Sequence, residues 1–303
     1  MIPTYNSSPT LRLALQSVLL QDFRDFEVWV IGDGCTDDSG EVVTSYDDDR
    51  IHWLNLPTNS GGPSLPRREG ITRAVGRYVA YIGHDDLWFP WHLTGLVDCI
   101  ETTGSEFVYS LGAMVTPEGV TQTFSLPHEA WCASEIVSPI NWLHRKDLLG
   151  RAASWSVNVK YGDDREFLRR LLKANVRLGF RKQLTVLKFP AQDWRIYSTK
   201  TNFPQERYIQ ALSENAVQLR NELLLEFAAS ASSVRSRASS PYKRLINRGA
   251  YDLLRVYGFH RWPVNDLLYR RYRKRAGLNV HRLRRAEPSR EHTPQRMTPV
   301  ENA

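Results

Sequence analysis

The 303-residue sequence has few cysteines and no long apolar run. Cys35, Cys99 and Cys132 form no metal-ligand pattern, so the sequence supports neither a disulfide framework nor a zinc site. No segment approaches the roughly 20 apolar residues that cross a bilayer, and Met1 leads directly into Ile2 without the regions of a signal peptide. The sequence therefore predicts a protein of a reducing, cytoplasmic compartment.

Acidic residues are absent between Arg270 and Arg285, where eight basic residues account for more than the whole net charge of +7. Such a run is typical of a solvated tail or of a segment that meets an anionic membrane surface. With the apolar residues of Leu245 to Leu268, it suggests peripheral contact at the inner face of a membrane. A nucleic-acid partner is not expected, because basic and aromatic residues do not alternate through the rest of the chain.

Strands and helices alternate over the first hundred residues. Phe26–Ile31, Ile51–Leu56 and Val79–Ile82 are short apolar runs that predict buried strands, and residues 8–19 and 65–75 have the pattern of helices between them. This spacing predicts βαβ units and a mainly parallel sheet flanked by helices. Hydrophobic content of 42% and charged content of 24% are ordinary for a globular protein with one core.

Polar side chains follow the predicted strands. They are Thr4 to Asn6, Asp33, and the pair Asp85 and Asp86. Because the carboxyl ends of parallel strands share one edge of a sheet, these side chains are expected to gather there, where open α/β folds bind ligands. Adjacent carboxylates hold divalent cations that bridge phosphates, although an Asp pair also commonly caps a helix.

The rest of the chain is less periodic. Asp163 or Asp164 is predicted to cap an amphipathic helix, a long helix is predicted from Gln205 to Phe227, and Ala228 to Ser240 resembles a linker. Further strands are predicted at Glu106–Met114, Val120–Phe124 and Leu184–Phe189, a strand leading into a helix at Ser138–Leu149, a short helix at Pro241–Gly258, and disorder after Arg285.

Four segments in order give the chain a specific resemblance. PTYN, VIGDGCTDDS, PRREGI and YIGHDDLW, which begin at Pro3, Val30, Pro66 and Tyr81, resemble the family 2 glycosyltransferases of the GT-A fold. The resemblance is strong over residues 1–95 and weaker to about residue 200. It implies a Rossmann-like domain over 1–202, with a nucleotide-sugar half (1–95) and an acceptor half (96–202), followed by a helical basic extension (203–285) and a tail (286–303).

The resemblance also implies roles for individual residues. Asp85 matches the Asp that holds Mn²⁺ or Mg²⁺ on the donor diphosphate, and Asp164 matches the catalytic base. Gly83 departs from the commonest Asp-x-Asp-Asp pattern, so the contact of the first Asp is missing or passes to His84, which would touch the ribose or a phosphate. Five further positions would contact the nucleotide or its surroundings: Pro3, Thr4 and Tyr5 line the base pocket, Asp33 accepts from the base or ribose, and Arg67 contacts the base or its neighbouring Asp.

The resemblance implies a hexosyltransferase of polysaccharide biosynthesis. Its donor would be a nucleotide-diphospho-sugar, and its acceptor a glycan or a lipid-linked hydroxyl, with inversion at the anomeric carbon. Two alternatives stay open, a degenerate sugar-nucleotide-binding protein and a nucleotidyltransferase. The second is disfavoured because PTYNSSPT carries neither Gly nor Lys, unlike a phosphate-binding loop.

Overall fold

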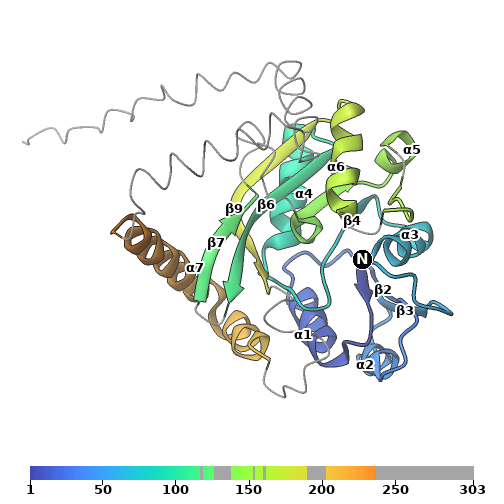
Figure 1. Cartoon of the computed structure of the whole chain (residues 1–303), viewed down its shortest axis with the longest axis horizontal. Coiled ribbons are helices and arrows are strands. Elements are labelled where there is room, and N and C mark those ends of the chain that lie inside the picture. The colour runs from blue at the N-terminus through green and yellow to red at the C-terminus, as the bar shows by residue number, and fades with distance from the viewer. Residues whose placement is uncertain (117–118, 126–137, 153, 160–161, 190–202, 237–303) are drawn as a thin grey trace, which may run out of the picture.

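The computed structural model describes residues 1–116, 119–125, 138–152, 154–159, 162–189 and 203–236, which form an α/β fold with helices on both faces of the strands (Figure 1). The predicted alternation of strands and helices in the first half is confirmed. Its elements are β1 (Ile2–Thr4), α1 (Ser8–Leu19), β2 (Val28–Gly32), α2 (Ser39–Thr44), β3 (Ile51–Asn55), α3 (Ser64–Arg73) and β4 (Tyr78–Ala80).

The strands β1, β2 and β3 form a parallel sheet in that order. Successive side chains of a strand point to opposite faces. Val28 and Val30 of β2 accordingly pack in one core cluster with α1. On the other face α3 approaches so closely that a Cβ on Gly70 would lie 3.2 Å from Cγ1 of Ile31. The middle strand is therefore covered by helices on both faces.

Backbone hydrogen bonds connect β1 to β4. The Met1 nitrogen donates to the carbonyl of Ala80 over 2.9 Å, and Ile82 N–H donates to the carbonyl of Met1 over 3.1 Å. Met1 is thus bonded to Ala80 and to Ile82, the residues before and after the one that lies opposite it. This is the hydrogen-bond pattern of parallel strands. β4 thus runs in the same direction as β1, and the residues that follow both strands lie at one edge.

The second half of the chain builds a mixed sheet in the order β4-β8-β6-β9-β5, with β7 paired to β6. β8 is antiparallel to both β4 and β6, and β9 is parallel to β6, so β9 runs in the same direction as β4. The elements are β5 (Leu87–Trp88), α4 (His92–Thr103), β6 (Phe107–Thr116), β7 (Gly119–Phe124), a 3-10 helix (Pro139–Asn141), β8 (Trp142–Arg145), α5 (Leu148–Ala152), α6 (Asp163–Lys173) and β9 (Leu178–Lys188).

Helices cover both faces of this mixed sheet as well. Val108 of β6 packs in a cluster with Leu96 of α4, whereas its neighbours Phe107 and Tyr109 pack with Phe167 of α6. All five side chains are buried. The alternation along β6 therefore places α4 and α6 on opposite sides, and the whole molecule has three layers.

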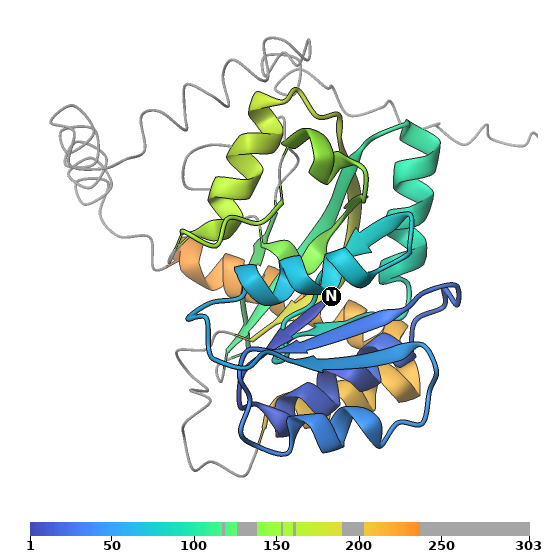
Figure 2. The same ribbon diagram turned by 90° about the vertical axis from the view of Figure 1, so that its right-hand side faces the viewer.

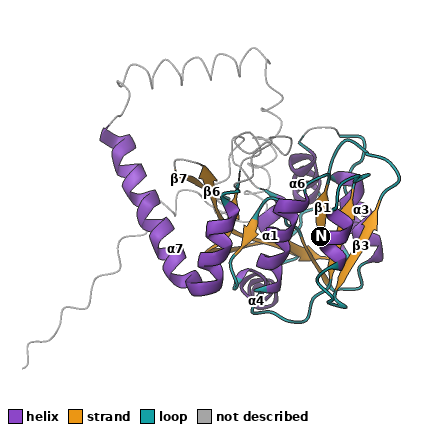
Figure 3. Cartoon of the chain, turned by 90° about the horizontal axis from the view of Figure 1, so that it is seen from below, coloured by secondary structure: helices purple, strands orange, loops and turns teal. Residues whose placement is uncertain are grey.

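The helix α7 (Gln205–Ser236) lies alongside β7 and α1 (Figures 1 and 3). Its buried residues Leu212 and Leu219 share a core cluster with Leu187 and Phe189 at the end of β9. α7 therefore packs against the second half of the chain, and the division after residue 202 stays a prediction. The predicted helix from Gln205 is confirmed.

The helix α7 is kinked. Asn215 has φ −157° and ψ 81°, and its Oδ1 accepts the N–H of Gln218 over 3.0 Å, as an N-cap does at the start of a second helix. That helix continues to Ser236, so the prediction of a linker from Ala228 is wrong over residues 228–236. A stretch rich in alanine and serine is typical of a linker, yet alanine is also the strongest helix former.

Several predictions fall on other parts of the chain. The helix Pro241–Gly258, the basic run Arg270–Arg285 and the tail lie outside the described residues. Cys35 and Cys99 are free thiols, and Cys132 is also outside. Among the helices of the described ranges, none combines the length and the apolarity that crossing a bilayer requires.

Candidate active site

A cavity of about 680 Å³ lies at the edge where β1, β2, β4 and β9 end. Its walls come from seven separate segments of the sequence, and the structure brings every predicted site residue together in it. Those residues are Pro3, Thr4, Tyr5, Asp33, Arg67, His84, Asp85 and Asp164. Asp86 of the predicted carboxylate pair also lines the cavity, as do Asp163 and Lys188, to which the sequence analysis assigned no ligand contact.

The ends of β1 and β2 form one wall. Asp33 N–H donates to the carbonyl of Thr4 over 2.8 Å, which continues the parallel pairing one residue beyond the strands. The Asp33 side chain is buried, and its Oδ1 accepts the N–H of Ser60 over 2.9 Å. Asp33 therefore holds the loop of residues 59–63 against the cavity. Its contact with a nucleotide stays a prediction.

Arg67 connects the two halves of the molecule. Its Nη1 lies 2.9 Å from Oδ2 of Asp163, and the hydroxyl of Ser64 donates to the same oxygen over 2.8 Å. The guanidinium carbon lies 4.3 Å from the ring centroid of Trp155, a cation–π distance. Figure 2 shows α3, which carries Arg67, between the first-half strands and α6. The aspartate that Arg67 contacts is therefore Asp163 rather than Asp33, the Asp near the predicted base pocket.

The first turn of α6 positions two carboxylates. The N-cap is Gly162, with a φ of 73°, and the helix begins at Asp163, so the prediction that Asp163 or Asp164 caps it is wrong. The Asp163 carboxylate is instead engaged by Arg67 and Ser64. Asp164, the next residue, lines the cavity, and its Oδ1 accepts the N–H of Arg165 over 2.7 Å.

The electrostatics of Asp164 suit proton transfer. Burial raises the pKa of its carboxyl group, and the neighbouring charge of Asp163 raises this pKa further. The N–H of Arg165 and the charge of Arg67 oppose both effects. A carboxylate with a raised pKa is a stronger base than an exposed one, which favours a role in general base catalysis.

The two carboxylates that follow β4 have different surroundings. Asp86 is buried; its Oδ1 accepts the N–H of Phe189 over 3.0 Å, and its Oδ2 lies 3.6 Å from Nζ of Lys188. Burial raises the pKa of Asp86, and the Lys188 ammonium opposes the rise. Asp85 is half-buried, and its backbone carbonyl accepts a hydrogen bond from Gln205 over 3.0 Å. Asp86 is thus committed to the fold, and Asp85 keeps its carboxylate at the cavity.

The donor atoms of His84 and Asp85 fit a divalent cation that also binds phosphate. His84 Nδ1 lies 3.3 Å from the carbonyl oxygen of Pro3, which can only accept a hydrogen bond, so the ring proton belongs on Nδ1. Nε2 then carries a lone pair, and it is buried without a partner in the described part of the chain. Mg²⁺ commonly takes one or two protein ligands and completes its shell with phosphate oxygens and water. No group of three His, Cys, Asp or Glu ligands occurs among the described residues, and such a site does not need one.

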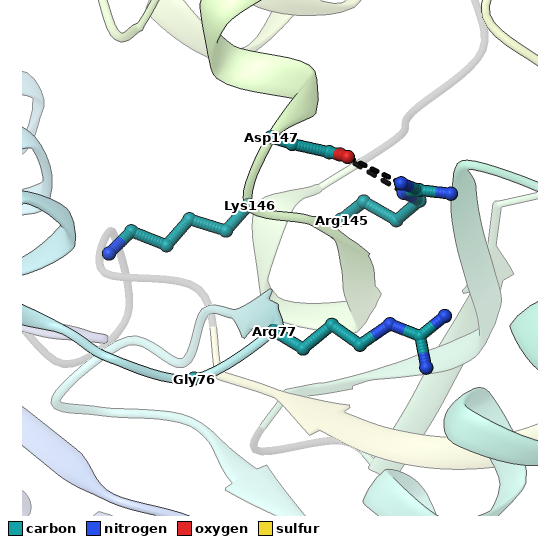
Figure 4. Close-up of a pocket in the computed structure, with 5 residues that line it drawn as sticks. All are labelled: Gly76, Arg77, Arg145, Lys146 and Asp147. Carbon is teal, nitrogen blue, oxygen red and sulfur yellow. Dashed lines mark hydrogen bonds and ion pairs between the residues drawn. The ribbon is translucent and has the colours of Figure 1, made fainter.

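A second cavity, of about 450 Å³, lies at the opposite end of β4 (Figure 4). Its basic side chains have partners within the protein: Arg145 pairs with Asp147, Arg77 with Glu101, and Lys146 donates to the carbonyl of Ala74. We therefore place the candidate active site in the first cavity. The residues that line the second are Gly76, Arg77, Arg145, Lys146 and Asp147.

Comparison with solved structures supports the fold. The chain is similar to Staphylococcus aureus TarS, residues 1–349, in complex with UDP, with a TM-score of 0.56 and 23% identity over 80% of this chain and 75% of that one. The same fragment in complex with UDP-GlcNAc gives a TM-score of 0.56 over 80% and 76%. The predicted GT-A fold, an α/β sheet flanked by helices, is confirmed.

Curated relatives match a shorter segment. YibD of Escherichia coli K12, an uncharacterized glycosyltransferase, is 35% identical over 89 residues, which are 29% of this chain and 26% of its own. TuaG of Bacillus subtilis 168, a putative teichuronic acid biosynthesis glycosyltransferase, is 35% identical over 88 residues, 28% of this chain and 34% of its own. The match thus spans about a third or less of the length of these relatives.

The profile of the family described as Glycosyl transferase family 2 matches residues 1–174. That span exceeds half of the chain and contains all eight predicted site residues. The chain belongs to glycosyl transferase family 2.

Proposed function

We propose that this protein is an inverting glycosyltransferase that moves a sugar, of the hexose type, from a nucleotide-diphospho-sugar to a hydroxyl of a glycan or lipid-linked acceptor. The observation that carries the proposal is that Asp164, Asp85 and the end of β1 line one cavity. The TarS fragment is described with UDP and UDP-GlcNAc, and a Campylobacter jejuni relative is named a β-1,3-glucosyltransferase acting on an undecaprenol-linked glycan.

The reaction needs a base at the acceptor. The acceptor oxygen attacks the anomeric carbon from the side opposite the diphosphate, the bond from that carbon to the diphosphate oxygen breaks, and the bonding electrons leave with the nucleoside diphosphate. Asp164 takes the proton of the acceptor hydroxyl as it attacks. Its raised pKa makes it a better proton acceptor than an exposed aspartate. Arg67 and Asp163 hold the start of α6 and so fix where this carboxylate lies.

Asp85 and His84 are the residues that would hold a divalent cation, Mn²⁺ or Mg²⁺. Such an ion, when bound, would supply positive charge beside the diphosphate and so stabilise the negative charge that develops on this leaving group. The cavity favours this reading because its described lining has five carboxylates and only two basic side chains, Arg67 and Lys188. Without a cation, the negatively charged diphosphate would enter a cavity whose own side chains carry a net negative charge.

The test is release of nucleoside diphosphate from UDP-, GDP- and dTDP-sugars, with Mn²⁺ or Mg²⁺ and with EDTA. Asp85→Ala and Asp164→Asn are compared with Asp98→Asn, a matched change on the exposed surface of α4. We expect one donor to be turned over in a metal-dependent way. Both cavity variants should lose that turnover, and the Asp98 variant should keep it.

Other outcomes separate the alternatives. Donor binding without turnover for any acceptor offered would favour a sugar-nucleotide-binding protein. Release of pyrophosphate from a nucleoside triphosphate and a sugar phosphate would identify a nucleotidyltransferase. Turnover that persists in EDTA would remove the metal from the proposal and leave the Asp164 base in place.

Membrane contact through the basic run Arg270–Arg285 stays a proposal, because these residues lie outside the described part of the chain. Flotation with liposomes that contain anionic lipid compares the full chain with one that ends at Ser240. Loss of flotation in the shorter chain would support contact at the inner face of a membrane. Equal recovery of the two would remove it.

A further inference from the structure

Lys188 lies at the candidate active site because β9 ends at the same edge of the sheet as β4. It is the last residue of β9, which runs parallel to β4, so the sheet delivers its side chain to the edge where Asp85 lies. The side chain is 29% exposed, and its Nζ lies 3.6 Å from the buried Oδ2 of Asp86. Lys188 therefore has one side fixed by a buried carboxylate and another side toward the cavity.

The two basic side chains of the described lining differ in what they already bind. Arg67 forms an ion pair with Asp163 at 2.9 Å and stacks on Trp155, so its charge is committed to joining α3 and α6. Among the residues that the structure describes, Lys188 has one ion-pair partner, Asp86, at the longer distance of 3.6 Å. An ammonium has three donors, so this contact leaves donors of Lys188 available for a ligand.

The glycine of the metal motif is linked to this lysine. A Cβ at Gly83 would lie 2.7 Å from Oδ2 of Asp86 and 2.8 Å from Oδ1 of Asp85, closer than real contacts allow. Asp86 cannot easily yield, because it is buried and bound to the N–H of Phe189. A larger residue at position 83 would therefore displace the carboxylate that holds Lys188. The departure from Asp-x-Asp-Asp makes room for this arrangement.

We propose that Lys188 binds the diphosphate of the nucleotide-sugar donor, held in position by Asp86 in the space that Gly83 leaves open. The inference rests on the proposed function. The ammonium of Lys188 donates hydrogen bonds to phosphate oxygens in the bound donor, and it stays beside them as the sugar–oxygen bond breaks and negative charge accumulates on the diphosphate. Gly83 leaves the first motif position without a side chain, and the end of β9 supplies a cation beside Asp86.

The test separates the diphosphate from the rest of the nucleotide. Binding of UDP, GDP and dTDP to the full chain is measured by calorimetry, and the matching nucleoside is titrated by NMR. Lys188→Met is expected to weaken the binding of the nucleoside diphosphate about tenfold and to leave the affinity for the nucleoside unchanged. Lys188→Arg should retain most of the affinity. Lys182→Met, on the exposed part of the same strand, is the matched control and should change neither value.

A second variant tests the link to the motif. Gly83→Ala is expected to weaken the binding of the nucleoside diphosphate, because it displaces Asp86. The double variant Gly83→Ala/Lys188→Met should bind the diphosphate only slightly more weakly than Lys188→Met alone. Effects that add fully would mean that Gly83 acts on Asp85 and not through Lys188, and would overturn this part. Thermal melting of each variant shows that the fold is kept.

The outcomes distinguish this inference from the proposed function. If wild type binds a nucleoside diphosphate and Lys188→Met binds it equally well, the role of Lys188 is overturned and the proposed function stands. Equal losses of nucleoside and diphosphate affinity would also overturn it, because a contact with phosphate affects only the second. If wild type binds none of the three diphosphates, the proposed function fails and this inference fails with it.

Discussion

The two halves of the molecule reach the candidate site in different ways. In residues 1–95 the strands β1, β2 and β4 run parallel; Tyr5 and Asp33 directly follow the first two, and His84 and Asp85 follow β4 after a short loop. In the second half the sheet is mixed, and its contributions come from the first turn of α6 and the end of β9. In the first half, the site residues can thus be found from the sequence by looking just after each apolar strand. The second half depends on which strands pair over long range.

The largest expected effect separates the roles of the halves. Asp164→Asn, in the second half, should lower kcat by about 10²- to 10⁴-fold because the acceptor loses its base. Asp33→Asn, in the first half, should mainly raise KM for the donor. Steady-state kinetics over donor concentration measure both. A change confined to KM in Asp164→Asn, or to kcat in Asp33→Asn, would contradict this division of labour.

The next prediction breaks the contact between the halves. Arg67→Met leaves Asp163 as an unpaired, largely buried charge, and removal of one partner of such a pair typically costs about 3 to 5 kcal/mol of stability. Because Arg67 lowers the pKa of Asp164 and Asp163 raises it, the acidic limb of the kcat/KM profile should move to higher pH. Urea unfolding and a pH–rate profile measure the two effects.

Arg68→Met is the matched control for Arg67→Met, because Arg68 is the next residue of α3 and is exposed. It should shift stability by less than about 0.5 kcal/mol and leave the pH profile in place. Equal behaviour of the two variants would show that the contact between α3 and α6 does not act on Asp164.

A smaller effect tests whether α7 belongs to the core of the second half. Leu212 is 3% exposed, and its truncation to alanine should cost about 2 to 3 kcal/mol of unfolding free energy. Leu225, on the same helix, is 71% exposed, and its truncation should stay within about 0.5 kcal/mol. Equal, small effects in urea unfolding would mean that α7 is an appendage, as the predicted division after residue 202 implies.

The smallest effect is a pH dependence that originates in the second half. Burial lowers the pKa of His92 to about 3 and that of His144 to about 4. The unfolded chain takes up these protons near pH 6.5 while the folded chain does not, so stability is full above that pH and falls below it. Each histidine should cost up to about 1.4 kcal/mol of unfolding free energy per pH unit, down to its folded pKa.

Thermal midpoints between pH 8 and 5 measure this loss, and NMR identifies the residues. The ring signals of His92 and His144 should not shift over that range. Titration of either ring near pH 6.5 with the fold intact would contradict the burial on which the prediction depends.

The sequence predicted the strands of the first half, and the eight site residues that it named all line the cavity. It did not place Lys188 at the cavity, although one signal was present: Lys188 ends the apolar run LTVLK, as Asp33 follows another apolar strand. A polar residue at the end of a strand lies at the edge with the cavity only if that strand runs in the same direction as β4, and for β9 this direction must be known. This direction follows from two antiparallel pairings through β8, which no local pattern encodes.

The role of Asp163 was equally beyond reach. At the sequence level it is a typical cap, and only its distance of 2.9 Å from Arg67, 96 residues earlier, shows that it pairs across the molecule. Helix capping is a local competition for backbone N–H groups, and a buried guanidinium outweighs it here.

The central place of β9 has a consequence for shortened forms of the protein. The family profile ends at residue 174, before β9 begins at Leu178, yet β9 lies between β6 and β5 in the sheet. A fragment cut at that family limit would expose the long edge of β6, a ready template for pairing with another copy. We expect such a fragment to aggregate, whereas one that keeps α7 should stay dispersed. The limits of a family and the limits of a folding unit are different quantities in this chain.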